Sequence, residues 1–337
     1  MGNFCCRPYN AVELHQEQRL DGPKTPTVTI NDFVVLRKLA EGGNGRIFLV
    51  KKKGSDTVLA MKVIRKSSLE TYVQYQNMLS ERKVLATVDC PYLSKLYYAF
   101  QTTTRLFLIT DYYEGGDLRS HLANGCFTEI QAAFYCAEIA IALDYLHSQH
   151  FVYRDLKPEN VLLDKNGHIR VIDMGLCKHL GRDRSKWSTG GTVSYLPPEV
   201  ILKKNYTYSA DWWALGVLLW ELLTGKDPFE GSNEKQVFDQ ILNKRLVKPP
   251  SMSISAFNVC FRLLDRNPNN RLGANGLSDL QNHGFFSHLD WEKLKNKQLS
   301  SPFMPQVSED TSDETIALSH TLSDPVLNFR FAFSQFS

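Results

Sequence analysis

Short apolar runs separated by glycines and polar turns occupy the first third of the chain. Their Val, Ile and Leu content is typical of β-strands, and the strands are expected over residues 33–39, 47–50, 58–64, 96–101 and 106–110. A longer segment over about residues 69–88 predicts a helix that stops before Cys90-Pro91. The first 110 residues therefore predict a small, mostly β unit that carries one helix.

Beyond Gly115 the pattern becomes helical. Thr128 and Gln131 have the spacing of a capping box, a signature of a helix N-terminus. The helix that follows is expected to present one apolar face, made of Ile130, Phe134, Ala137, Ile141 and Tyr145. Residues 211–225 are apolar almost all round, which predicts a buried helix ended by Gly225. We therefore predict an α+β fold with two lobes, one small and mostly β, the other larger and helical.

Composition narrows the class of protein. The 337 residues with 43% hydrophobic content suffice for one large domain or two lobes. A formal net charge of +3 is too mild to indicate a nucleic-acid partner. No apolar run approaches the roughly 18 residues of a membrane span, and no secretory leader is visible. Five cysteines are scattered singly, which favours reduced thiols in the cytoplasm: Cys90, Cys126, Cys136, Cys177 and Cys260.

The segment MGNFCC at the N-terminus is a candidate for lipid attachment. Gly2 behind a removable Met is the acceptor arrangement for myristoylation, and Cys5 and Cys6 suit palmitoylation. One myristoyl chain anchors a protein only marginally, whereas a second acyl chain makes membrane attachment stable. Cys6 stands where Ser or Thr is preferred, so an unmodified terminus is the alternative.

A glycine-rich stretch follows the first expected strand. Because Arg46-Ile47 continue into a strand, the stretch cannot be a dinucleotide fingerprint, which must open a helix. A glycine turn between two strands instead suits a flap whose backbone N–H groups close on phosphates. The expected nucleotide contacts are Leu39, Ala40, Glu41, Gly42, Gly43, Asn44, Gly45, Arg46 and Ile47.

A lysine inside an apolar strand needs a negative partner, because burying an unpaired ammonium is costly. Lys62 stands in VLAMKVI, and Glu81 lies nineteen residues later in the expected helix. We interpret them as an ion pair that orients Lys62 towards the α- and β-phosphates of a nucleotide. Exposed charges on separate elements are the alternative.

The loop YRDLKPEN, residues 153–160, combines groups that phosphoryl transfer requires, since that reaction depends on positioning and charge stabilisation. Asp155 can accept the proton of an attacking hydroxyl, and Lys157 can reach the transferring phosphate. Asn160 and Asp173 offer oxygen ligands for two Mg²⁺ ions. The sequence therefore predicts an ATP- and Mg²⁺-dependent catalytic site.

Together these motifs resemble a eukaryotic protein kinase over residues 33–286. Further shared signatures are DMG, LPPE, DWWALG and NPNNRLG. Tyr153, the GLCK run and a tail with SPFMP and terminal phenylalanines look like the AGC group of serine/threonine kinases. That group includes the cyclic-AMP-dependent, Akt, protein kinase C and ribosomal S6 kinases. The resemblance implies a leader over residues 1–32, the kinase domain, and an AGC tail over residues 287–337.

The resemblance also assigns roles to single positions. Ala60 and Leu162 would enclose adenine, and the hinge from Asp111 to Tyr113 would offer it backbone hydrogen bonds. Lys157 in the loop points to a Ser or Thr acceptor.

Three acidic residues match positions that receive arginine upstream of the target hydroxyl in basophilic relatives, namely Asp117, Glu159 and Glu221. The expected partners are thus protein substrates with Arg near the target Ser or Thr. Glu199 and Arg271 would form a buried structural ion pair.

Two positions match phosphorylation sites of the group. Phosphorylated Ser188 would pair with Arg154 and Lys178 and order the activation loop, which implies an upstream kinase. Ser337 would follow a hydrophobic motif formed by Phe333 and Phe336. In an alternative register, Phe331 and Phe333 precede Ser334.

Some positions depart from the family pattern. Ala40 replaces the first flap glycine, which predicts weaker or slower nucleotide binding, and Met174 replaces the usual phenylalanine of the DMG motif. Two functions are weighed, an active kinase and, as the alternative, a pseudokinase or membrane-bound scaffold that uses the fold to bind partners. A pseudokinase usually lacks Lys62, Asp155 or Asp173, and all three are present.

Overall fold

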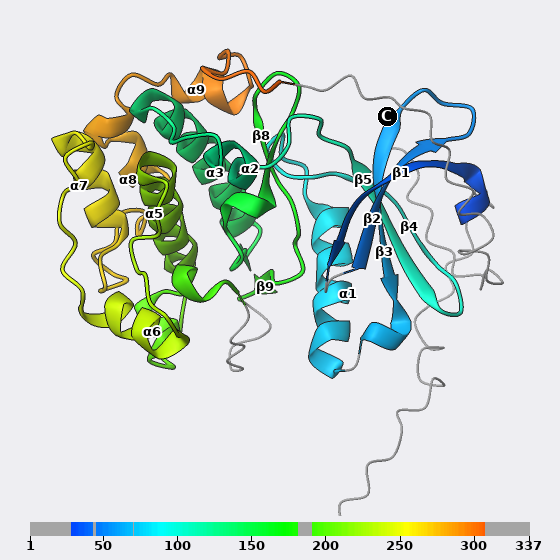
Figure 1. Ribbon diagram of the computed structural model, residues 1–337, viewed down its shortest axis with the longest axis horizontal. Helices are drawn as coiled ribbons and strands as arrows, with labels where there is room; N and C mark the ends of the chain where they lie inside the picture. Colours follow the sequence, from blue (N-terminus) through cyan, green and yellow to red (C-terminus); the bar gives the residue numbers. More distant parts are fainter. Residues whose placement is uncertain (1–27, 43–44, 70, 181–190, 307–337) are drawn as a thin grey trace, which may run out of the picture.

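Two lobes make up the protein. The computed structural model describes residues 28–42, 45–69, 71–180 and 191–306. Figure 1 shows a sheet with one long helix at one end of the molecule and a group of helices at the other. Separate hydrophobic cores lie in the sheet and among the helices. The predicted two-lobed α+β fold is confirmed.

The small lobe is built on a five-stranded antiparallel sheet with the order β1-β2-β3-β5-β4. Its strands are β1 (Phe33–Gly42), β2 (Gly45–Lys52), β3 (Val58–Arg65), β4 (Leu96–Gln101) and β5 (Arg105–Asp111). Alternate apolar side chains, among them Phe48, Val50 and Met61, are fully buried in the core of this lobe. All five expected strands are present.

Helix α1 (Tyr72–Thr87) contacts both lobes. A capping box starts it, because Gln74 N donates to Thr71 Oγ1 at 3.2 Å and Thr71 N to Gln74 Oε1 at 3.0 Å. This box starts α1 at Tyr72, a few residues later than the expected residue 69. A separate short 3₁₀ helix, η3 (Lys66–Ser68), precedes it. Val84 and Leu85 near its end belong to the core of the large lobe. The same helix also contacts β4 in the sheet of the small lobe.

The large lobe surrounds two long helices, α3 (Glu129–Ser148) and α5 (Ser209–Thr224). Gly225 ends α5 in the left-handed conformation with φ 69°, as expected of a glycine C-cap. The shorter elements are α2 (Leu118–Leu122), β6 (Phe151–Val152), η4 (Pro158–Asn160), β7 (Val161–Leu163), β8 (Ile169–Val171), β9 (Lys178–His179), η5 (Val193–Tyr195), α4 (Pro198–Ile201), α6 (Glu234–Asn243), α7 (Ile254–Leu263), α8 (Ser278–Gln281), η6 (Gly284–Phe286) and α9 (Trp291–Lys295).

The prediction of a single apolar face on α3 is wrong. Every residue from 132 to 143 is buried, whereas Ile130, assigned to the apolar face, is 62% exposed. The helix occupies the centre of the lobe and packs against α5, β6, β8 and α9 on different sides. Ile130 lies in the first turn of α3, before the part of the helix that is buried among these elements.

The segment after residue 286 packs on the large lobe as far as the structure describes it. Trp291 and Leu294 of α9 are buried in the main core. Further along, the Phe303 ring meets Phe127 edge-on at a centroid distance of 5.8 Å. Residues 287–306 are therefore anchored to the helices, and the boundary of the tail at residue 287 stays a prediction.

Candidate active site

Lys62 lies between two carboxylates at the junction of β3 and α1. Its Nζ contacts Glu81 Oε1 at 2.7 Å and Asp173 Oδ1 at 3.6 Å. The side chains of Lys62 and Glu81 are only 16% and 6% exposed. Burial alone would lower the pKa of Lys62, but Glu81 and Asp173 outweigh it and raise that pKa above its ordinary value. The ammonium therefore stays charged, and the expected pairing of Lys62 with Glu81 is confirmed.

Asp155 is the centre of a second group of polar side chains. Lys157 Nζ contacts its two carboxylate oxygens at 3.1 and 2.9 Å. Asn160 Nδ2 donates to Asp155 Oδ2 and to the Asp155 carbonyl, both at 2.9 Å. The spacing of these residues along the loop thus brings all three side chains together, with Pro158 opening the short helix η4 between them.

The pKa of Asp155 lies above its ordinary value. Burial is the main cause, and the nearby charge of Asp173 adds to it, whereas Lys157 and Asn160 lower the pKa by stabilising the carboxylate. The Asn160 carbonyl accepts from Ile172 N at 2.9 Å, so the residue before Asp173 lies beside the loop that carries Asp155. A buried carboxylate with a raised pKa is a candidate proton acceptor.

Asp211 holds this loop in place, a role that its neighbours in the sequence do not indicate. It is fully buried at the start of α5, and its carboxylate accepts hydrogen bonds from Tyr153 N at 2.9 Å and Arg154 N at 2.8 Å. His147 Nε2 lies 2.7 Å from the same carboxylate. Arg154 has φ 70°, a left-handed conformation that these bonds stabilise. The backbone before Asp155 is therefore fixed by a residue 57 positions away from Arg154.

The donors near Asp155 fit magnesium bound together with phosphate. Asn160 uses its Nδ2 for Asp155, which leaves its Oδ1 for a cation, and Asp173 supplies a carboxylate. Oxygen ligands of this kind suit Mg²⁺, which proteins usually hold through one or two side chains plus substrate phosphates. Among the described residues, no group of three or more His, Cys, Asp or Glu side chains is placed to hold a metal ion.

The glycine stretch forms a hairpin, as predicted. Gly42 at the end of β1 pairs with Gly45 at the start of β2, and Ala40 pairs with Ile47. Gly45 has φ 119°, and a Cβ there would lie 2.5 Å from the Val63 carbonyl oxygen, so only glycine fits. Leu39 lies in β1. The expected contacts Gly43 and Asn44 lie outside the described residues.

Glu41 and Arg46 lie at the exposed tip of the hairpin. Glu41 accepts from Arg46 Nε at 2.6 Å and from Lys38 Nζ at 2.9 Å. The tip therefore carries an ion-paired cluster beside the glycine turn.

The expected adenine-binding residues lie where the lobes join. Ala60 in β3 pairs with Thr110 of β5, the strand that ends at Asp111. The Asp111 carboxylate accepts from Tyr97 at 2.7 Å and from Tyr113 at 3.0 Å, which directs this side chain to the tyrosines. Leu162 lies in β7 and bridges to Asp117.

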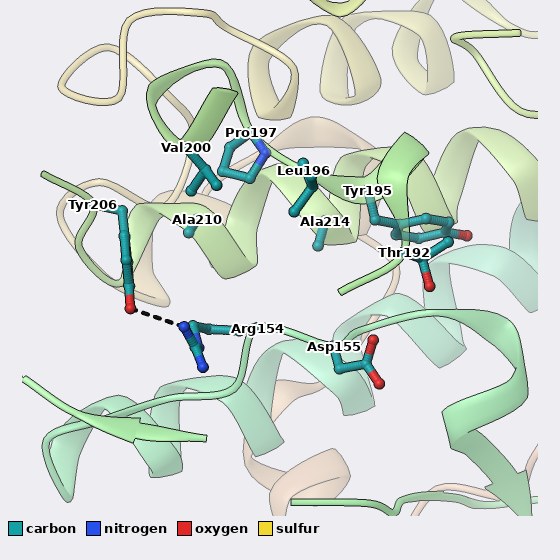
Figure 2. Close-up of a pocket in the computed structure, with 10 residues that line it drawn as sticks. All are labelled: Arg154, Asp155, Thr192, Tyr195, Leu196, Pro197, Val200, Tyr206, Ala210 and Ala214. Atoms are coloured by element: carbon teal, nitrogen blue, oxygen red, sulfur yellow. Dashed lines mark hydrogen bonds between the residues drawn. The ribbon is translucent and has the colours of Figure 1, made fainter. Parts of the chain in front are cut away.

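A pocket opens beside Asp155 on the side of the large lobe (Figure 2). Arg154 lines the pocket next to Asp155, and its Nη1 donates to the Tyr206 hydroxyl at 3.0 Å. Its Nε donates to the Leu176 carbonyl at 2.7 Å. The pocket is lined by Arg154, Asp155, Thr192, Tyr195, Leu196, Pro197, Val200, Tyr206, Ala210 and Ala214. The lining thus combines polar groups beside Asp155 with apolar side chains such as Leu196 and Val200.

The three acidic residues predicted to receive arginine already have partners. Asp117 caps α2 by accepting from Ser120 N at 2.8 Å. Arg119 donates Nε to Glu159 Oε1 at 2.8 Å and Nη1 to Glu221 Oε1. Arg119 was not among the site residues expected from the sequence. The one signal for it is that it is the basic residue of the stretch DLRS, which begins at the expected site residue Asp117.

Several predicted sites lie beyond the described ranges, namely Gly2, Cys5, Cys6, Ser188 and Ser337. Their modification stays a prediction. In the described part of the chain, no helix has the length and apolar content needed to cross a membrane.

A glycine hairpin over a paired strand lysine, with an aspartate loop at the lobe junction, defines the class of protein kinases. The chain belongs to the protein kinase family, since the family described as "Protein kinase domain" matches residues 33–286.

Among curated proteins, the chain is similar to several ribosomal S6 kinases. It is 44% identical over 290 residues to human "Ribosomal protein S6 kinase alpha-2", which covers 83% of this chain and 39% of the relative. It is also 44% identical over 282 residues to "Ribosomal protein S6 kinase alpha-6" of Danio rerio, covering 82% and 38%. The third is "Ribosomal protein S6 kinase 2 alpha" of Xenopus laevis, 42% identical over 292 residues, covering 85% and 39%.

The chain thus spans about two fifths of the length of these relatives. The resemblance to the AGC group, and to its S6 kinase branch, is confirmed.

Proposed function

We propose that this protein is a serine/threonine protein kinase that transfers the γ-phosphoryl group of Mg-ATP to hydroxyls of protein substrates. The observation that carries the proposal is the convergence of two groups at the lobe junction. Lys62 is ion-paired at 2.7 Å to Glu81 and lies 3.6 Å from Asp173. Asp155 is held by Lys157 and Asn160. Ile172, the residue before Asp173, donates its N–H to the Asn160 carbonyl at 2.9 Å.

Each residue has a role in the proposed reaction. Asp155 accepts the proton as the substrate oxygen bonds to the γ-phosphorus and the bond to the bridging β–γ oxygen breaks, which releases ADP. Lys62 positions the α- and β-phosphates, and Lys157 compensates charge on the transferring group. When bound, Mg²⁺ supplies charge neutralisation at the phosphates, and Asn160 and Asp173 would hold it.

The experiment that tests this function is a positional peptide library with labelled ATP. Phosphate is expected to enter serine and threonine peptides, in line with Lys157 in the loop, and peptides with Arg two or three residues before the target are expected to rank highest. Absence of transfer to every peptide by phosphorylated protein would refute the kinase function. Transfer without any basic preference would refute only the arginine rule.

The pH dependence of kcat/KM should reveal the state of Asp155. Because its pKa is raised and the reaction needs the carboxylate, activity is expected to fall as pH drops through that raised pKa. Lys157 lowers this pKa, so Lys157→Ala is expected to move the acid limb of the profile to higher pH, besides reducing the rate. The exposed Lys165→Ala is the matched control and should leave the limb in place. An unmoved limb in Lys157→Ala would argue against Asp155 as the proton acceptor.

Regulation and location form the second part of the proposal. We propose phosphorylation of Ser188 by an upstream kinase, phosphorylation of Ser337, and acylation of Gly2, Cys5 and Cys6. Dual acylation would hold the kinase at a membrane surface, whereas the unmodified form would stay in the cytoplasm. Intact-mass spectrometry of the native protein is expected to show two or three acyl chains and one or two phosphates. A mass equal to that of the bare chain would reject both modifications.

A further inference from the structure

Arg119 connects three parts of the large lobe at the edge of the catalytic loop. It lies in α2, whereas Glu159 belongs to η4, four residues after Asp155, and Glu221 belongs to α5. Its Nε contacts Glu159 Oε1 at 2.8 Å, and its Nη1 donates to Glu221 Oε1. One guanidinium therefore bridges two carboxylates in the way a bound arginine side chain would.

The two carboxylates differ in their surroundings. The Glu221 side chain is 7% exposed, and its second oxygen Oε2 accepts from the Tyr195 hydroxyl, so both of its oxygens are engaged. Glu159 and Arg119 are 45% and 42% exposed. A buried carboxylate without a cation would be costly, so Arg119 supplies a charge that Glu221 needs in the absence of any substrate. At the same time, the exposed guanidinium can leave without moving the backbone of α2.

We propose that Arg119 is a specificity-determining residue that occupies the subsite for a substrate arginine between Glu159 and Glu221. The proposal rests on the proposed kinase function and names the substrate class more sharply. A peptide with arginine at this subsite must displace Arg119, and a peptide without it leaves Glu221 paired. The kinase therefore accepts serine and threonine peptides that lack this arginine.

Arg119 is expected to lower selectivity because a buried polar group costs more when it is left unpaired than it gains when it is paired. A site built to bind a charged group rejects ligands that lack it mainly because its own groups are then left unpaired. Arg119 removes that penalty, and it also makes an arriving arginine exchange one ion pair for another rather than gain a new one. Both effects lower the selectivity, which is the ratio of kcat/KM for the peptide with arginine to that for the peptide without it.

The test compares two synthetic serine peptides, identical except that arginines at the second and third positions before the serine are replaced by alanine. In Arg119→Ala, kcat/KM for the arginine peptide relative to the alanine peptide is expected to rise about tenfold or more through KM, with kcat little changed, since charge-assisted hydrogen bonds are worth this much. Arg119→Lys, which keeps the charge but loses the two-point guanidinium, is expected to give an intermediate ratio. Lys235→Ala removes an exposed charge from α6 and should leave the ratio unchanged.

A purely structural role for Arg119 predicts a different result. Both peptides would then lose activity in Arg119→Ala by the same factor, and the unchanged ratio would overturn the inference. Thermal unfolding of each variant checks the fold, and Arg119→Lys still decides the question where Arg119→Ala is unstable.

Fluorescence anisotropy with labelled forms of the two peptides, in the absence of ATP, separates this inference from the kinase function. Wild type is expected to favour the arginine peptide only modestly, and Arg119→Ala is expected to favour it about tenfold more strongly. Peptide binding without phosphoryl transfer would defeat the proposed function alone, whereas transfer with an unaltered ratio would defeat this inference alone.

Discussion

Asp155→Asn is expected to lower kcat about 100- to 10,000-fold, the usual worth of a positioned general base. The asparagine keeps an oxygen that can accept from Lys157 and Asn160, which hold Asp155 at 2.9 Å each, so the loop should keep its shape. What is lost is the carboxylate that takes the hydroxyl proton. Mg-ATP binding is therefore expected to stay near the wild-type level, since Lys62 and Asp173 are untouched.

Single-turnover phosphate transfer and equilibrium ATP binding measure the two quantities separately. Asp89→Asn makes the same chemical change at an exposed position and should alter neither. If Asp155→Asn retained wild-type kcat, another group would have to take the proton. If it lost ATP binding in proportion to kcat, its role would be in the fold of the loop rather than in the chemistry.

The features that sequence predicts best are set by neighbours along the chain. The hairpin glycines, Lys62 within β3 and the loop from Asp155 to Asn160 all depend on local spacing. In the loop, Lys157 and Asn160 meet Asp155 because they follow it by only two and five positions. Pro158 limits the conformations of the turn between them. Such short-range constraints can be predicted from the sequence alone.

The features that sequence missed depend on distant contacts. Asp211 bonds Arg154 over 57 positions, and Arg119 reaches Glu221 over 102. Nothing near either residue indicates these partners, because the packing of α2 and α5 beside the catalytic loop brings them together. The exposure of Ile130 has the same origin, since periodicity shows which residues share a face but not how many sides of a helix are covered.

The ion pair between Glu199 and Arg271 was expected only from the resemblance to protein kinases, and it is present in the core. Arg271 Nη1 and Nη2 contact the two Glu199 oxygens at 2.8 and 2.9 Å, and the two side chains are 0% and 4% exposed. Arg271 also donates to the carbonyls of Asp265 at 3.0 Å and Ser209 at 2.7 Å, and it lies over the Trp213 ring. One guanidinium thus ties the segment before α5 to the turn that follows α7.

Arg271→Met is accordingly expected to lower the free energy of unfolding by about 3–5 kcal/mol, because it leaves the Glu199 carboxylate buried without a cation. Urea unfolding followed by tryptophan fluorescence is a suitable measurement, since Trp212, Trp213 and Trp220 are buried in the same lobe. The exposed Arg245→Met should change stability by less than about 0.5 kcal/mol.

The double variant Glu199→Leu with Arg271→Met identifies the cause of that loss. It is expected to be more stable than Arg271→Met alone, because removing the orphaned carboxylate removes its desolvation cost. It should still be less stable than wild type, because the carbonyls of Asp265 and Ser209 lose their donor. The single variant Glu199→Leu completes the comparison. A double variant whose loss of stability equals the sum of the losses in Glu199→Leu and Arg271→Met would mean that the side chains contribute independently and that the pair is not coupled through its charge.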